Sequence, residues 1–80
     1  MPYIREEIRS ALGHGEDART SGELNYCITC EVLKYLGIKG ESYQTYNDIM
    51  GALECCKQEL YRRKISKYED TKIESNGDVY

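Results

Sequence analysis

The run of residues best suited to bind a ligand is Tyr61-Arg62-Arg63-Lys64. Arginine side chains grip phosphate groups through paired hydrogen bonds, and aromatic rings stack on nucleobases. A tyrosine beside two arginines on one helix turn therefore suits a small anionic, nucleotide-like ligand. The alternative is a solvated basic face that pairs with acidic residues of its own or a neighbouring chain. The residue pattern leaves both interpretations open.

A second group of candidates consists of uncharged hydrogen-bonding side chains near the expected helix starts. These are Asn25, Tyr26, Thr29, Tyr43 and Asn47. A helix N-terminus favours anions without net positive charge, because its backbone N–H groups point outward. Capping and turn formation use the same residue types. Together with the tyrosine and the two arginines above, these residues form the ligand-binding set that the sequence suggests.

The cysteines and the single histidine offer little for metal binding or catalysis. Cys27-x-x-Cys30 has a common zinc spacing, but the second pair, Cys55 and Cys56, is adjacent and would diverge by about 100° on a helix. His14 has no carboxylate or thiol partner at a useful spacing. We therefore expect free thiols that pack as small hydrophobic groups, no metal, no cofactor and no catalytic activity.

Composition indicates one small helical domain that gains stability by self-association. The chain has 80 residues, no Phe or Trp, and eight Tyr. A chain of this size buries only about 60% of its unfolded surface, so a monomer would be marginally stable. We therefore expect a homo-oligomer, with tyrosines suited to protein interfaces or ligand stacking.

Charge and hydropathy exclude several classes of protein. The net charge of −3 argues against a duplex nucleic-acid binder, which needs a basic face. The start MPYIREEIRS lacks an apolar signal region, and no segment approaches the ~20 apolar residues of a membrane span. These features predict a cytoplasmic protein without a membrane partner.

Apolar spacing predicts an all-α fold over residues 1–80, a small antiparallel helical hairpin or three-helix bundle with a long C-terminal helix. The first helix should cover 3–12 with Pro2 in its first turn, followed by a flexible loop over 13–21. The second should start near Ser21 or Gly22, with Ser21 as its cap, and end at Gly37 or Gly40.

The third helix should be the longest element. Ser42 or Thr45 can cap its start, and the helix should continue to about Glu74, before a short extended tail over 75–80. Its apolar positions follow helical spacing, namely Ile49, Leu53, Cys56 and Leu60, with Lys64 next in the same register.

Three stretches of the chain resemble a family of small phage and bacterial proteins of unknown function. They are GELNYCIT, SYQTYNDIMGALECCKQELYRR and YEDTKIESNGDVY, within which GELNY, GALEC, ELYRR, YED and NGDVY are the distinctive strings. Residues 13–20 depart most from the family pattern. The resemblance carries no enzymatic activity over to this chain.

The resemblance gives the binding hypothesis a biological setting. Compact phage accessory proteins often counter bacterial immunity, and some are oligomeric helical sponges that sequester nucleotide-derived signals. By analogy, the leading hypothesis is such a sponge in the host cytoplasm, with Arg62 and Arg63 on phosphates and Tyr26, Tyr43 or Tyr61 stacking. The rival hypothesis is a protein-interaction module that blocks a host defence enzyme directly.

Overall fold

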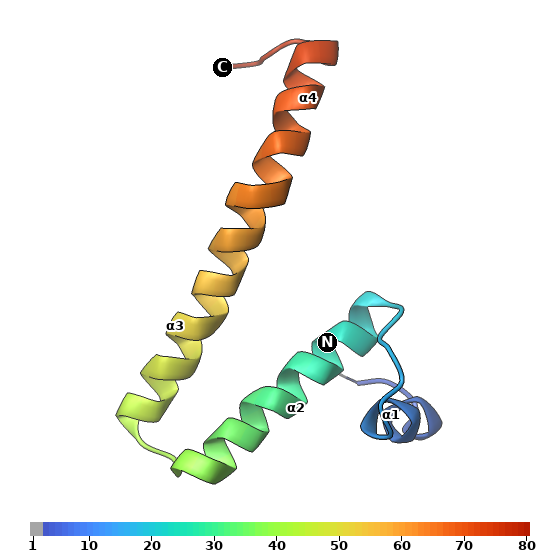
Figure 1. Cartoon of the computed structure of the whole chain (residues 1–80), viewed down its shortest axis with the longest axis vertical. Helices are drawn as coiled ribbons and strands as arrows, with labels where there is room; N and C mark the ends of the chain where they lie inside the picture. The colour runs from blue at the N-terminus through green and yellow to red at the C-terminus, as the bar shows by residue number, and fades with distance from the viewer. Residues whose placement is uncertain (1–2) are drawn as a thin grey trace. The chain divides into compact units, whose positions relative to one another are not determined.

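A computed structural model describes residues 3–80, and all of its regular elements are helical. In chain order they are α1 (Glu6–Gly13), α2 (Ser21–Lys39), α3 (Tyr43–Leu60), the π-helical turn η1 (Tyr61–Ile65) and α4 (Ser66–Asn76). Figure 1 labels the four α-helices along the chain. No strand occurs within the described residues, which confirms the predicted all-α class with a long C-terminal helix.

Backbone contacts divide the chain into two compact units. The N-terminal unit is Met1–Thr45 and the C-terminal unit is Tyr46–Tyr80. The first unit holds α1, α2 and the start of α3, and within it α1 packs on α2. The second unit holds the rest of α3, then η1, α4 and the last four residues.

Helix α1 differs from its predicted span at both ends. It begins at Glu6 because Arg5 is extended, with φ −62° and ψ 151°, and Glu6 and Glu7 suit a helix N-terminus. It ends one residue later than predicted, where Gly15 adopts φ 96°. The Gly15 and Glu16 N–H groups then donate to Leu12 and Ala11 carbonyls, each at 3.1 Å. Pro2, expected in the first turn, lies outside the described residues.

Helix α2 is capped by Thr20, so the prediction of Ser21 as the cap is wrong. The Glu23 backbone N–H donates to Thr20 Oγ1 at 3.1 Å. In return, Glu23 Oε1 accepts a hydrogen bond from the Arg19 N–H at 3.1 Å. Two otherwise unpaired donors at the helix start are thereby satisfied, as in a capping box, and Ser21 becomes the first helical residue.

The connection from α2 to α3 follows the predicted residues. Helix α2 ends at Lys39 and is followed by its C-cap Gly40, whose φ of 80° and ψ of 148° are open almost only to glycine. Ser42 then caps α3, because its Oγ accepts from the Thr45 N–H at 3.1 Å. Thr45 is 7% exposed, and its hydroxyl lies 3.1 Å from Ser42 Oγ.

Helices α3 and α4 continue one another through η1, where the N–H of Ser66 donates to the Tyr61 carbonyl. This i→i+5 bond places one extra residue in the turn. In an unbroken α-helix Ile65 would lie about 140° around the axis from Leu60, and the extra residue removes most of that offset. The turn therefore brings Ile65 toward the direction of Leu60, beside Lys64, which the sequence predicts as the next position of the register.

The helix after η1 ends close to the predicted point. Helix α4 runs to Asn76, two residues past the predicted Glu74, and so takes in the first two residues of the predicted tail. Gly77 ends it with φ 89° and a 2.8 Å hydrogen bond from its N–H to the Ile73 carbonyl. Asn76-Gly77 is thus the stop signal that the sequence indicated.

The aligned apolar residues of the C-terminal unit form what we call the apolar stripe. Its members are Ile49, Leu53, Cys56, Leu60, Ile65 and Tyr68. Leu60 is 56% exposed and Tyr68 63%, and no hydrophobic side chain among residues 3–80 is buried. The chain by itself therefore has the secondary structure of a folded protein without a buried apolar core.

None of the helices within residues 3–80 combines the length and the hydropathy that crossing a bilayer requires.

Two glycines of α2 give a matched test of this helix boundary. Gly40→Ala should destabilise the fold by about 1–3 kcal/mol, because an L-residue is strained at its backbone angles. Gly37→Ala lies inside the helix with open space at Cβ, and should add about 0.5–1 kcal/mol of stability. Urea unfolding followed by circular dichroism measures both. Equal effects of the two substitutions would contradict this assignment.

Candidate functional site

The predicted basic and aromatic run lies in η1, and both of its arginines contact one carboxylate. Arg62 Nη2 donates to Glu59 Oε2 at 3.0 Å and to Oε1 at 3.2 Å. Arg63 Nε donates to Glu59 Oε2 at 2.7 Å. The arginine side chains are 67% and 69% exposed. These are ordinary i,i+3 and i,i+4 pairs on a solvated helix face.

Tyr61 is tied to α4 through its hydroxyl group, which donates a hydrogen bond to Glu69 Oε1. The carboxylate holds the phenol proton and repels a phenolate, so the pKa of Tyr61 is raised, with a smaller contribution from Asp70. Glu69 is eight residues from Tyr61, beyond the i+4 spacing that helix-pair reasoning covers. No sequence rule singled it out.

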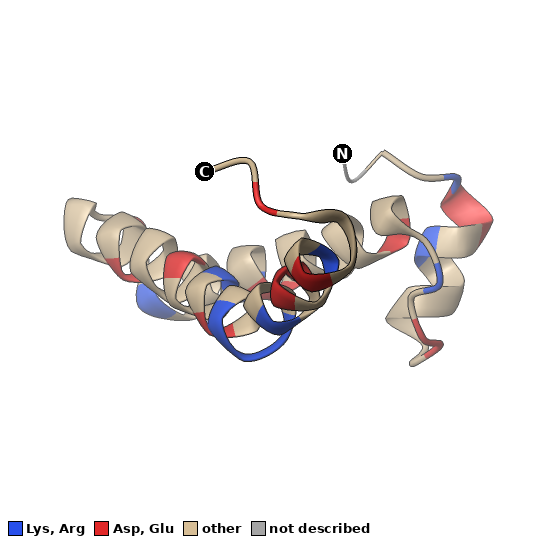
Figure 2. Cartoon of the chain, turned by 90° about the horizontal axis from the view of Figure 1, so that it is seen from above, with Lys and Arg blue, Asp and Glu red and all other residues tan. Residues whose placement is uncertain are grey.

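An anion that binds at η1 must compete with these carboxylates for the same side chains. Two arginines share Glu59, and Lys64 and Lys67 add positive charge to the same stretch of helix, where Figure 2 shows blue next to red segments. Exposed ion pairs are typically worth only about 0–1 kcal/mol. A phosphate could therefore displace the carboxylate. Arg62 borders a hollow of about 250 Å³ that is open to solvent.

The α2 candidates lie on neighbouring turns of one helix. Thr29 Oγ1 donates to the Asn25 carbonyl at 2.8 Å and lies 3.3 Å from Asn25 Oδ1. The Thr29 hydroxyl group is therefore already hydrogen-bonded within its own helix. Tyr26 is half-buried, and a hydrogen bond with Cys30 raises its pKa. Tyr26 also borders a shallow hollow of about 340 Å³, whose other lining residues are Leu12, Gly13, Cys27, Cys30, Glu31 and Lys34.

The remaining candidates lie at the start of α3. Tyr43 is the first residue of the helix and is 80% exposed, and Asn47 is exposed one turn later. The eight candidates therefore fall into two sets. Four lie in the N-terminal unit, and Asn47 lies with the η1 residues in the C-terminal unit. Within the second set, the structure brings together only the three consecutive residues of η1, and the polar partners of those are Glu59 and Glu69.

The cysteines are all free thiols. Cys27 is half-buried in the N-terminal unit, whereas Cys30, Cys55 and Cys56 are exposed. The sequence predicted that all four pack as small hydrophobic groups, but packing within the chain explains only Cys27. Within the described part of the chain, no group of three or more His, Cys, Asp or Glu residues could hold a metal ion. His14 caps α1, with Nδ1 2.7 Å from the Ser10 carbonyl.

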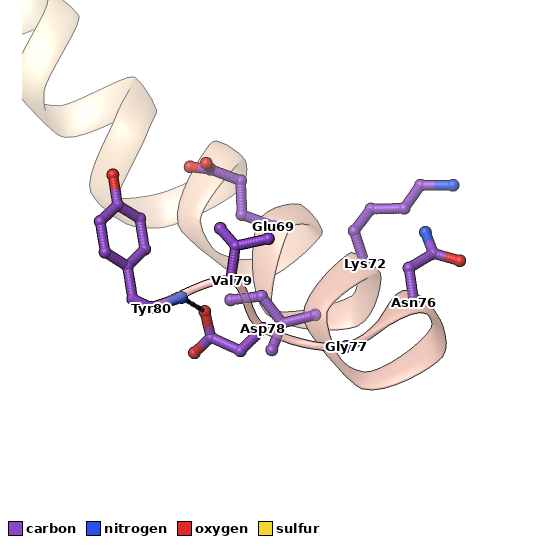
Figure 3. A pocket seen from close by; sticks show the side chains of 8 residues that line it. Glu69, Lys72, Asn76, Gly77, Asp78, Val79 and Tyr80 are labelled. Atoms are coloured by element: carbon purple, nitrogen blue, oxygen red, sulfur yellow. Dashed lines mark hydrogen bonds between the residues drawn. The ribbon is translucent and has the colours of Figure 1, made fainter.

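A hollow that the sequence did not indicate lies at the end of α4. Figure 3 shows Val79 and Tyr80 turning back beside the helix, near Glu69. The Tyr80 N–H donates to Asp78 Oδ1 at 2.9 Å and holds this turn. The hollow has a volume of about 320 Å³ and is open to solvent. Its apolar wall and the exposed Val79 and Tyr80 add to the apolar surface of the C-terminal unit.

Comparison with known proteins finds one family. The family model described as a domain of unknown function, DUF6899, matches residues 1–79. No curated protein and no solved structure matches the chain. The match agrees with the predicted membership of a family of unknown function.

Ring titration of Tyr61 tests the contact between η1 and α4. Glu69→Gln should lower the Tyr61 pKa toward its ordinary value of about 10, because it removes the charged acceptor. Asp70→Asn should lower it less, because Asp70 acts only through charge. Since the pKa is raised, the stabilising contact is complete below pH ~10 and is lost as pH rises through the folded pKa. NMR of ring-labelled tyrosine measures both variants, and equal shifts would argue against the hydrogen bond.

Proposed function

This chain belongs to the DUF6899 family, and we propose that it is a protein-interaction module that binds through the apolar stripe of its C-terminal unit. The proposal assigns no catalytic step to the chain. The single observation that carries it is the exposure of the stripe, on a chain with no buried hydrophobic side chain among residues 3–80.

The physical argument is the cost of exposed apolar surface. Removing apolar surface from water contributes about 25 cal/mol per Å². Leu53, Leu60 and Ile65 are 39%, 56% and 38% exposed, on one side of a continuous helix. A long helix face of this kind is the surface that helix-binding grooves and other helices recognise. The stripe therefore supports binding to protein better than binding to a small polar ligand.

The resemblance to small phage proteins suggests the class of target. In that setting the module would block a bacterial defence enzyme in the cytoplasm by covering part of its surface. The exposed Val79 and Tyr80 would extend the contact beyond the end of α4.

Sequestration of a nucleotide-derived signal is the second candidate function. The observation in its favour is the placement of Tyr61, Arg62 and Arg63 on one π-helical turn, since π turns are frequent at functional sites. The observation against it is that Glu59 and Glu69 already accept hydrogen bonds from all three side chains. The π turn also has a structural role, because it aligns the stripe.

Charge substitutions on the stripe test the interaction module. Leu53→Glu with Leu60→Glu should weaken partner binding at least about tenfold, because a buried unpaired carboxylate is costly. Cys55→Glu is a control for each of the two changes, because it adds one negative charge two residues from Leu53, on another side of the helix.

The measurement starts from proteins that co-purify with the wild-type chain and continues with the purified partner in calorimetry. Burial of the stripe predicts a negative heat-capacity change on binding, present in the control and lost in the double variant. Equal affinity of the wild type and the double variant would overturn the proposal.

Native mass spectrometry with cyclic dinucleotides and ADP-ribose tests the second candidate. If η1 binds phosphate, Glu59→Gln should strengthen binding several-fold, because the competing carboxylate loses its charge. Arg62→Ala with Arg63→Ala should weaken it. Lys57→Ala is the control, because it removes a cation that pairs with Glu54 instead. Absence of bound ligand in the wild type and in Glu59→Gln would count against sequestration.

A further inference from the structure

We propose that the apolar stripe is covered by the same stripe of a second copy of this chain, with the two helices antiparallel and related by a two-fold axis beside Cys56. The inference rests on the proposed function, because it names the protein that covers the stripe. It is carried by the order of residue types along the stripe and by the apolar area that two copies expose.

The stripe has the same order of residue types in both chain directions. Tyr46 lies three residues before Ile49, on a neighbouring position of the same helix face, and extends the series by one. With this tyrosine, the series from either end is Tyr, Ile, Leu, Cys, Leu, Ile, Tyr. A two-fold interface must be self-complementary, because every contact between two residues occurs twice. A series that reversal leaves unchanged therefore matches an antiparallel copy of itself.

The spacing of these residues keeps the match along the helix. Leu53 lies three residues before Cys56, and Leu60 lies four residues after it. Ile49 and Ile65 lie seven and nine residues away, and the extra residue of η1 shortens the second distance to about eight residues of α-helix. The terminal tyrosines lie ten and twelve residues away and are shortened in the same way. Each residue is thus level with its counterpart to within about 1.5 Å, the rise of one residue.

The charged residues are compatible with this register. The cations Arg62-Arg63-Lys64 lie level with the uncharged segment Met50-Gly51-Ala52 of the second copy. Glu54 and Glu59 fall at the same level, but five helical residues separate them by about 140° around the axis, so they lie on opposite sides of the stripe. Lys57 is the cation nearest the two-fold axis, and Glu54 of its own chain offsets its charge at 3.5 Å.

Two stripes expose enough apolar surface for a stable dimer. A specific interface buries at least about 1,000 Å² in total. One aromatic side chain can bury about 150–250 Å², and Tyr46 and Tyr68 are 46% and 63% exposed. Two copies bring four such tyrosines and ten other apolar side chains to the contact, of which Leu60 is the most exposed leucine. Their exposed parts supply an area of the required order.

The centre of the interface brings the two Cys56 side chains together. Packing within one chain does not explain this exposed thiol, whereas packing against its own copy does, because a free cysteine behaves as a small hydrophobic group. Cys55 is also exposed, but it points about 100° around the helix from Cys56 and away from the second copy. The adjacent cysteines therefore differ in the dimer although they are alike in the single chain.

Disulfide trapping of the full chain tests the position of the axis. One variant keeps only Cys56 and another keeps only Cys55, with alanine at the other three cysteine positions. Sedimentation equilibrium should show that both variants and the wild-type chain are dimers. Diamide, which oxidises neighbouring thiols to a disulfide, should link the Cys56 variant at least about tenfold faster, because only its thiols lie close enough to bond. Non-reducing gel electrophoresis over time measures both rates.

A second pair of variants tests the antiparallel direction. In a chain with alanine at all four cysteine positions, Leu53→Cys and Leu60→Cys should each link slowly alone, because each residue is about 10 Å along the helix from its own copy. An equimolar mixture of the two should form the mixed disulfide dimer at least about tenfold faster. Circular dichroism establishes that every variant keeps its helix content.

Several outcomes would overturn the inference. A monomeric wild-type chain would do so, as would equal oxidation rates of the Cys55 and Cys56 variants. Faster linking of Leu53→Cys alone than of the mixture would establish a parallel pair instead. If a monomeric chain still binds another protein through Leu53 and Leu60, the inference fails while the proposed function stands. If the chain neither forms a dimer nor binds another protein, both fail.

Discussion

Leu60 and Ile65 lie on one side of the long helix only because the turn between them holds an extra residue. The Ser66 N–H reaches back to the Tyr61 carbonyl, so the turn closes over five residues instead of four. Without this turn, the apolar residues of α3 and those of α4 would face different directions. A single hydrogen-bond shift therefore decides whether the C-terminal unit has one long apolar surface or two short ones.

The same turn determines what the basic residues do. Arg62 and Arg63 reach back one turn to Glu59, and the Tyr61 hydroxyl reaches forward to Glu69. The Tyr61 hydroxyl and both guanidinium groups thus each contact a carboxylate of the same chain. Such exposed contacts are individually weak, so they orient the side chains without preventing their exchange for stronger partners.

In the proposed interaction, the exposed stripe would link stability to function. An 80-residue chain has little surface to bury, and among residues 3–80 its hydrophobic side chains remain at least partly exposed. Folding of the C-terminal unit and binding to its partner would then share the same apolar contacts. Substitutions in the stripe should affect both together, which is why the opposite-face controls matter for interpretation.

The sequence by itself determined the helices and the glycines that end them, because propensity and capping are local properties. It also indicated membership of a family of unknown function. It also located Tyr61, Arg62 and Arg63 on one turn. It misplaced the α2 cap, because Thr20 and Ser21 are both good caps and only the contact with Glu23 separates them. It missed η1, whose extra residue leaves no local signature, and the contact with Glu69 that spans it. Only the three-dimensional path of the backbone decided that Ile65 joins the stripe, because one extra residue in a turn rotates every later side chain by about 100°.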